Sequence, residues 1–320
     1  MPLKEQKKAL VKLLVYSSFV YLAAKVKRNL SNSRKVPVRV TSRLPKPSNE
    51  HQSGFFSAMS YNIAGLPGII SQAITDRKSS TALIGNKINE YDIVNVQEDF
   101  NFHAALYDEG NKHPYRTVTK GPALWGDGLN TLSRFPIYEL KRVPWRHCTA
   151  SNCFTPKGFS YCRIGLAKEV FIDLYNVHAN AYEDAKSAYA RRLNMRQLLA
   201  FIQANSEGEA VLVMGDMNSS YSDPRDNVKE LVKKAGLTDT WIELMNGNQL
   251  PEILESIKYL PLLDIDHLSE SIDKIFYRSS RKIKLKPSNY RIEGKKFTDG
   301  NRLPLSDHLP VAVDFEWKLT

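Results

Sequence analysis

The chain has 320 residues and carries 45 Lys and Arg against 34 Asp and Glu, a formal net charge of +11. Its 42% hydrophobic and 25% charged residues are ordinary for a globular domain, which excludes a disordered, collagen-like or multi-span membrane protein. The charge is uneven, because residues 1–46 hold 12 Lys and Arg and one acid, whereas the remaining 274 residues hold 33 of each sign. The excess is therefore no argument for nucleic-acid binding by the body.

The first 28 residues combine an apolar run, Leu13–Ala24, with basic residues on both sides. The run is shorter than the ~20 residues of a spanning helix, and it has the length of a signal-peptide core without a small-x-small cleavage site. A lack of acids from Gln6 to Asn49 is typical of a mitochondrial presequence, and a basic interfacial helix on anionic lipid is a third option. We expect residues 1–28 to be a targeting or membrane-anchor segment rather than a solvated tail. Residues 29–54 are expected to be a polar linker.

This segment predicts a membrane-associated or secretory-pathway protein, and mitochondrial targeting stays open. The body, residues 55–320, alternates apolar runs with amphipathic ones. The expected strands are 55–63, 92–96, 129–137, 170–177, 210–214, 273–277 and 310–315, and the expected helices are 78–91, 183–205 and 227–235. Such interleaving predicts one mixed α/β domain.

Three cysteines, Cys148, Cys153 and Cys162, lie within fifteen residues of one another. Cys148 and Cys153 are spaced to close a small loop by a disulfide in an oxidising compartment, and two inert thiols are the alternative. A zinc site would need CxxC-type pairs and more nearby histidine.

Polar side chains follow the expected strands at the points where the strands end. They are Asn62, Glu98, His178, Asp216 with Asn218, Asp273, and Asp307 with His308. Each one alone fits an ordinary turn or a solvated loop. Six such positions in one order predict a shared cleft, since strand ends at one edge of a sheet carry loops on a rigid scaffold.

The order of these motifs resembles the endonuclease/exonuclease/phosphatase superfamily over about residues 55–317. The motifs are Ser60-Tyr61-Asn62-Ile63, Val96-Gln97-Glu98, Asn176-Val177-His178-Ala179-Asn180-Ala181, Gly215-Asp216-Met217-Asn218, Ile272-Asp273-Lys274-Ile275 and Ser306-Asp307-His308-Leu309-Pro310. That superfamily includes deoxyribonuclease I, AP endonucleases, inositol-phosphate phosphatases and neutral sphingomyelinases. The resemblance implies a four-layer α/β sandwich, in which two mixed β-sheets pack face to face and are flanked by helices.

The resemblance also implies a metal-dependent phosphodiesterase or phosphatase that uses Mg²⁺, with Mn²⁺ or another divalent cation as alternatives. Mg²⁺ takes oxygen ligands and keeps several waters, so few protein ligands suffice. Glu98 is the expected direct ligand, Asn62 would add its amide oxygen, and Asp307 would complete the site. The cation would stabilise charge on the phosphoryl group.

The remaining roles are also implied by the resemblance. His308 would accept the proton from water, and Asp273 would orient it. Asp216 would position the nucleophile, and Asn218 would donate a hydrogen bond to a phosphate oxygen. His178 would bind the phosphate and assist protonation of the leaving group. Two more residues are expected to bind substrate: Lys157 and Asn180.

Three stretches resemble neutral sphingomyelinases: Thr155-Pro156-Lys157-Gly158-Phe159, Gly126-Asp127-Gly128-Leu129-Asn130, and Ala190-Arg191-Arg192 in the helix after His178. Ser220 stands where inositol 5-phosphatases carry an Arg, and Ser271-Ile272-Asp273-Lys274 replaces a block typical of those enzymes. The neutral body weakens the electrostatic attraction that dominates DNA binding.

We therefore expect a monomeric phosphoesterase of the sphingomyelinase-type phospholipase C class, acting on a lipid headgroup at a membrane. A nuclease, an inositol-phosphate phosphatase and an inactive binding module are the alternatives.

Overall fold

The computed structural model describes residues 51–66, 71–120, 126–254 and 261–320, together with Val20 and residues 34–35 and 38–40. The expected targeting segment, residues 1–28, lies outside the described residues apart from Val20. In the part of the chain that the structure describes, no helix is both long enough and apolar enough to cross a bilayer.

One sheet has seven strands, of which only the neighbours β9 and β10 run parallel. In spatial order its strands are β1 (Arg34–Lys35), β7 (Ile137–Pro144), β8 (Gly158–Ala167), β9 (Val170–His178), β10 (Val211–Asp216), β12 (Asp273–Arg278) and β11 (Thr238–Asp239). The helix α4 (Ala185–Asn205) forms the crossover between the parallel pair, as a parallel connection requires.

The second sheet also has seven strands, and its one parallel pair is β3 with β4. Its spatial order is β13 (Ile283–Ile292), β14 (Val311–Leu319), β3 (Ser53–Asn62), β4 (Ile93–Gln97), β6 (Asn130–Ser133), β5 (Tyr115–Thr117) and β2 (Val38–Val40). Here α2 (Arg77–Lys87), followed by the short 3₁₀ turn Ile88–Glu90, makes the crossover.

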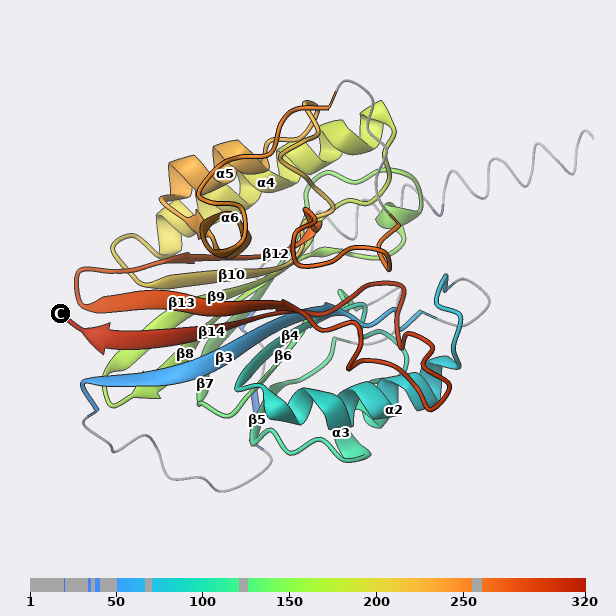
Figure 1. Ribbon diagram of the computed structural model, residues 1–320, viewed down its shortest axis with the longest axis horizontal. Helices are drawn as coiled ribbons and strands as arrows, with labels where there is room; N and C mark the ends of the chain where they lie inside the picture. The colour runs from blue at the N-terminus through green and yellow to red at the C-terminus, as the bar shows by residue number, and fades with distance from the viewer. Residues whose placement is uncertain are drawn as a thin grey trace, which may run out of the picture.

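The helices cover the outer faces of both sheets, which confirms the predicted four-layer α/β sandwich (Figure 1). On one side lie α4, α5 (Val228–Ala235) and α6 (Thr240–Leu244), and on the other lie α2 and α3 (His103–Asp108). Local sequence sets their ends. Asp184 caps α4 by accepting hydrogen bonds from the backbone N–H groups of Lys186 and Ser187, and α5 ends at Gly236 with φ +64°.

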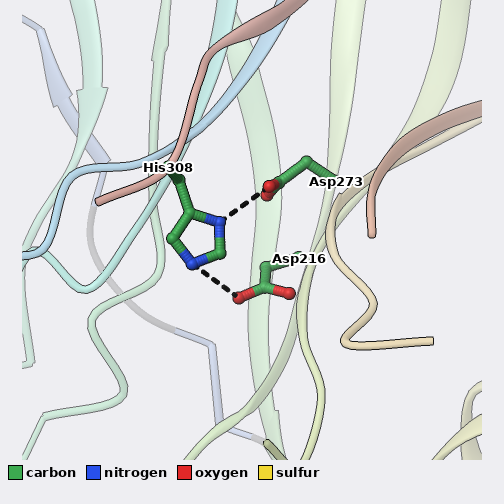
Figure 2. A group of neighbouring side chains, drawn as sticks. All are labelled: Asp216, Asp273 and His308. Atoms are coloured by element: carbon green, nitrogen blue, oxygen red, sulfur yellow. Dashed lines mark hydrogen bonds and ion pairs between the residues drawn. The ribbon is translucent and has the colours of Figure 1, made fainter. Parts of the chain in front are cut away.

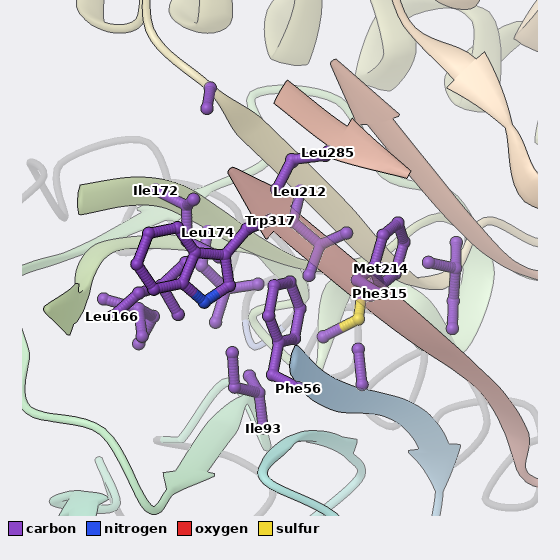
Figure 3. Packing of buried hydrophobic residues seen from close by; sticks show 14 of the residues in the cluster. Phe56, Ile93, Leu166, Ile172, Leu174, Leu212, Met214, Leu285, Phe315 and Trp317 are labelled. Atoms are coloured by element: carbon purple, nitrogen blue, oxygen red, sulfur yellow. The ribbon is translucent and has the colours of Figure 1, made fainter. Parts of the chain in front are cut away.

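The largest core lies between the two sheets. Its side chains alternate along the strands, so that one face of each sheet supplies them (Figure 3). Its labelled members are Phe56, Ile93, Leu166, Ile172, Leu174, Leu212, Met214, Leu285, Phe315 and Trp317. Two further buried clusters join the outer helices to the sheets. This packing holds the strand ends rigidly.

Two expectations about local structure are wrong. Within the expected linker, residues 34–35 pair with β7 and residues 38–40 pair with β5, so these five residues are edge strands. The expected strand 129–137 is two strands in different sheets. The chain turns between Ser133 and Ile137, where Pro136 has no N–H for a ladder and the backbone N–H of Phe135 donates to the Ser133 hydroxyl.

Candidate active site

Strand register places three of the predicted residues in a row at one edge of the first sheet. Asp216 ends β10, and it lies opposite His178 at the end of parallel β9. On its other side it lies opposite Asp273, the first residue of antiparallel β12. Because an antiparallel strand begins where its neighbour ends, all three side chains start from the same edge.

The second sheet brings Asn62 and Glu98 to the same edge. Asn62 pairs with Gln97 at the ends of β3 and β4, and Glu98 follows with a left-handed backbone at φ +60°. Gly65 packs directly against this turn, since a Cβ there would lie 2.2 Å from the carbonyl oxygen of Glu98. The backbone N–H of Asn101 also donates to the Gly65 carbonyl at 3.3 Å. The position of Glu98 thus depends on a glycine at residue 65.

The loop that carries Asp307 and His308 is tied to the end of β3. The Ser306 hydroxyl donates to the carbonyl of Asn62 at 2.7 Å. The buried guanidinium of Arg77 donates to the carbonyls of Ile63 at 2.9 Å and Leu305 at 2.8 Å. Arg77 therefore joins two segments that are more than 200 residues apart in the chain.

His308 and Asp273 form a buried pair, with Nδ1 of the histidine 2.7 Å from the Asp273 carboxylate (Figure 2). Nε2 of His308 points toward Asp216, at 3.9 Å. Burial alone would lower the pKa of His308, but the negative charges of Asp273, Asp216 and Asp307 outweigh it and raise that pKa. Burial raises the pKa of the Asp273 carboxyl. The pair is an Asp–His dyad whose second ring nitrogen faces the cavity.

Asp216 lies at the centre of the site and is 1% exposed. Its carboxylate accepts hydrogen bonds from the Asn62 amide at 3.2 Å and from the backbone N–H of Asn218 at 2.9 Å, and His178 Nε2 lies at 3.3 Å. Burial would raise the pKa of Asp216, but His178 and the charge of His308 more than offset this and lower it below its usual range. Asp216 is an ionised buried carboxylate.

A cavity of ≈ 780 Å³ opens over these groups. Seven of the ten predicted residues line it together with Asn62: Glu98, Lys157, His178, Asp216, Asn218, Asp307 and His308. Asp273 lies behind His308 and is not part of the lining. Three aromatic rings that the sequence did not single out complete the wall: Phe100, Phe154 and Tyr182.

Lys157 and His178 meet on one wall of the cavity. The Lys157 Nζ lies 2.7 Å from His178 Nε2, closer than any carboxylate to that ring nitrogen. Burial and the charge of Lys157 lower the pKa of His178. Both facts favour a neutral His178 whose Nε2 accepts a hydrogen bond from the ammonium group of Lys157, so that the lysine is the proton donor on this wall.

Glu98 and Asp307 are the two carboxylates that best fit a divalent cation. Burial first, and the neighbouring charge of Glu98 as well, raise the pKa of Asp307, so the two groups repel each other across the cavity. Hard oxygen donors held at such a position suit Mg²⁺. A second cluster, formed by one ligand atom each from Asp216, Asp273 and His308 within 4.8 Å of one another, is less suited because His308 and Asp273 already bond to each other.

Asn62 differs from its expected role as an oxygen ligand. The backbone N–H of Ala64 donates to its Oδ1 at 3.1 Å, and only the amide oxygen can accept that bond. The amide NH₂ therefore faces the acids, with Asp216 at 3.2 Å and Glu98 at 3.4 Å. Asn62 is a donor that holds the two carboxylates in place.

Asn180 does not reach the cavity, contrary to the expectation that it binds substrate. Its amide oxygen accepts from the backbone N–H of Thr149 at 2.9 Å, and its NH₂ donates to the Thr149 hydroxyl and to the carbonyl of Ala181, both at 2.8 Å. Because its polar atoms are all engaged, Asn180 fixes the loop at Thr149.

Several residues that support the site carried no signal in the sequence. Trp145 is fully buried, and its indole N–H donates to the carbonyl of His178 at 2.7 Å. Beyond Asp216, Glu270 accepts the backbone N–H of Ser222 at 3.2 Å and pairs with buried Lys274 at 3.1 Å. The Lys274 ammonium also lies 4.7 Å from the ring centroid of Tyr221. These contacts hold the loop after Asp216 against β12.

Cys148 and Cys153 form the disulfide whose presence the sequence left open, and Cys162 is a buried free thiol. The bridge closes the start of the segment that runs through the short turn Ala150–Cys153 to Lys157. Ser151, Asn152, Phe154 and Thr155 of that segment line the cavity.

Comparison with known proteins identifies relatives of this chain. The profile of Endonuclease/Exonuclease/phosphatase family 2 matches residues 62–261. A sphingomyelinase of Mycobacterium tuberculosis is 38% identical over 272 residues, which cover 83% of this chain and 53% of that protein. The chain thus spans about half the length of the curated relatives it matches.

Solved structures of similar fold include a mutant beta toxin of Staphylococcus aureus with bound magnesium ions, at TM-score 0.55 and 17% identity over 81% of this chain and 99% of that chain. Another is D. rerio TDP2 complexed with a single-strand DNA product, at TM-score 0.58 and 16% identity over 82% of this chain and 98% of that chain. At these identities the likeness shows the fold alone.

We expect Gly65→Ala to lower the free energy of unfolding by about 1–3 kcal/mol, because the added methyl group collides with the backbone at Glu98. Gly300→Ala is the matched control, since nothing lies within 4 Å of a Cβ there, and it should change stability by no more than about 0.5 kcal/mol. Denaturant titration of both variants measures this. Equal stability of the two variants would contradict the assigned contact.

Proposed function

Since this chain belongs to the endonuclease/exonuclease/phosphatase family, we propose that it hydrolyses a phosphodiester by attack of an activated water. The observation that carries the proposal is the Asp273–His308 dyad, which faces the buried Asp216 carboxylate across a cavity lined by Glu98 and Asp307. A base, an ionised carboxylate and a place for a cation then meet around one phosphoryl group.

The dyad supplies the base. Nδ1 of His308 is held by Asp273, so Nε2 is the atom that accepts a proton from water in the cavity. Asp216 is close enough to stabilise the imidazolium that forms, and it also orients the attacking water. Asp273 acts as an orienting group, because it lies behind the histidine.

The opposite wall serves the leaving group. The ammonium of Lys157 binds a phosphoryl oxygen or donates a proton to the departing alkoxide, and His178 holds that ammonium in place. Asn218 lines the cavity beside Asp216, where its amide can donate to a phosphoryl oxygen. Glu98 and Asp307 would hold a divalent cation, which supplies charge neutralisation on the phosphoryl oxygens.

The chemistry of the cavity favours a substrate with one phosphodiester and a cationic headgroup. Among the described residues that line it, Lys157 is the one fixed cation, against the carboxylates of Glu98, Asp216 and Asp307. A polyphosphate or a nucleic-acid strand would need more cations. Aromatic rings beside carboxylates suit a quaternary ammonium group, so we infer sphingomyelinase-type phospholipase C activity, as the 38%-identical mycobacterial relative supports.

We expect His308→Ala and Asp216→Ala to lower kcat by about 10²–10⁴-fold, the range attributed to a positioned acid–base group. His267→Ala is the control, since His267 is exposed and lies outside the cavity lining. Circular dichroism melts would show that the variants are folded, and Asp216→Asn keeps the shape if the alanine variant is unstable. Near-normal turnover in both alanine variants would refute the assigned roles.

A parallel assay tests the substrate class. The purified chain is incubated with sphingomyelin vesicles, plasmid DNA and soluble inositol phosphates, each with Mg²⁺ and with EDTA. We expect release of phosphocholine with Mg²⁺ and its loss with EDTA. Nicking of plasmid alone would identify a nuclease, release of inorganic phosphate from inositol phosphates would identify a phosphatase, and silence on all three would identify a binding module.

We also propose that residues 1–28 bring the enzyme to a membrane, on the strength of their apolar run and basic flanks. The deletion should end at residue 28, because residues 34–35 and 38–40 pair with the two sheets. We expect loss of the protein from the membrane fraction of fractionated cells, with the melting temperature unchanged. An unchanged share in that fraction would contradict the proposal.

A further inference from the structure

A second hollow lies along the surface of α4 and is separate from the active-site cavity. It consists of two adjoining depressions of ≈ 470 and ≈ 310 Å³, which share His147 and Leu193. Neither depression has a lining residue in common with the active-site cavity. We call the two together the α4 groove.

The α4 groove is apolar along its floor and cationic along its rim. The larger depression contains Leu193, Ala200 and Phe201 together with Arg146 and Arg196. The smaller one adds the apolar residues Ala185 and Ala190 and one more cation, Lys186. Among the described residues that line either depression there is no acid.

The two arginines of the rim differ from most described arginines of the body. Seven others form ion pairs with carboxylates: Arg116, Arg134, Arg142, Arg163, Arg191, Arg225 and Arg291. Arg146 and Arg196 have no ion pair with a described carboxylate. Glu230 lies near enough to be influenced by Arg196, but its carboxylate pairs with Lys234 at 2.7 Å. In an electrically neutral body, the groove therefore gathers uncompensated positive charge.

The groove is held in shape by contacts between the loop and the helix. The backbone N–H of Arg146 donates to the Gln197 side chain at 2.9 Å, and the Asn194 amide donates to the carbonyl of His147 at 3.0 Å. The disulfide between Cys148 and Cys153 restrains the next residues. A rigid site loses little conformational entropy when it binds a ligand.

We propose that the α4 groove binds one anionic phospholipid molecule. Arg146 and Arg196 bind the headgroup phosphate, and an acyl chain lies on Leu193, Ala200 and Phe201. Charge complementarity selects an anion, and the apolar floor between the cations selects one with a hydrocarbon chain. A nucleic acid would instead require cations spaced along a backbone and exposed aromatic rings for stacking. An inorganic phosphate would leave the apolar floor uncovered.

Calorimetric titration of the full chain with monomeric dihexanoyl-phosphatidylglycerol tests the proposal. We expect saturable binding with one site, weakened at least tenfold in the double variant Arg146→Gln, Arg196→Gln. The matched control is Arg281→Gln, Lys282→Gln, which removes two exposed cations from the turn between β12 and β13 and should bind as the unaltered chain does. This control also accounts for lipid bound by the basic N-terminal segment, which is the same in both variants.

Three further arms decide what the groove recognises. Dihexanoyl-phosphatidylcholine should bind at least tenfold more weakly, because its headgroup has no net charge. Inorganic phosphate should also bind more weakly, and Leu193→Ser should weaken the lipid but not the phosphate. The proposal is overturned by equal loss in the groove and control variants, by phosphate binding as tight as lipid binding, or by a single-stranded oligonucleotide that binds more tightly than the lipid. Circular dichroism melts confirm that each variant is folded.

Discussion

The buried carboxylate of Asp216 is the constraint on which the rest of the site depends. An ionised carboxylate at 1% exposure is costly unless donors and cations surround it. Its partners come from separate parts of the chain: the Asn62 amide from the second sheet, the His178 ring from the next strand, and the backbone of Asn218 from the following loop. The need to compensate one charge therefore holds both sheets together at this edge.

The connections of the fold explain how these partners meet. The crossovers through α2 and α4 give each sheet one parallel pair, so β3, β4, β9 and β10 all end at the same edge. The antiparallel strands β12 and β14 begin there, which adds Asp273 and the loop before β14. The Arg77 guanidinium then fastens that loop to the end of β3, and the core between the sheets keeps the edge rigid.

Motif residues were easier to predict than the atoms they use. The sequence singled out Asn62, Lys157 and Asn180, but their types and order do not reveal their hydrogen bonds. The backbone N–H of Ala64 takes the Asn62 oxygen, and Thr149 takes both ends of the Asn180 amide. Only Lys157 of the two expected substrate-binding residues lines the cavity, where it contacts His178. Amide side chains have two different ends, and neighbouring backbone decides which end faces a site.

Sequence alone determined the order of strands and helices, the neutral charge of the body and the residue types that follow each strand, because periodicity and composition are local properties of the chain. It misjudged the turn at Pro136 and the edge strands at residues 34–35 and 38–40, where pairing partners lie about 75 or more residues away. Tertiary structure decided that His308 faces Asp273, that Glu98 faces Asp307, and that Arg146 lies beside Arg196 in the α4 groove. Such pairs follow from strand register and packing between distant segments, which no spacing along the chain encodes.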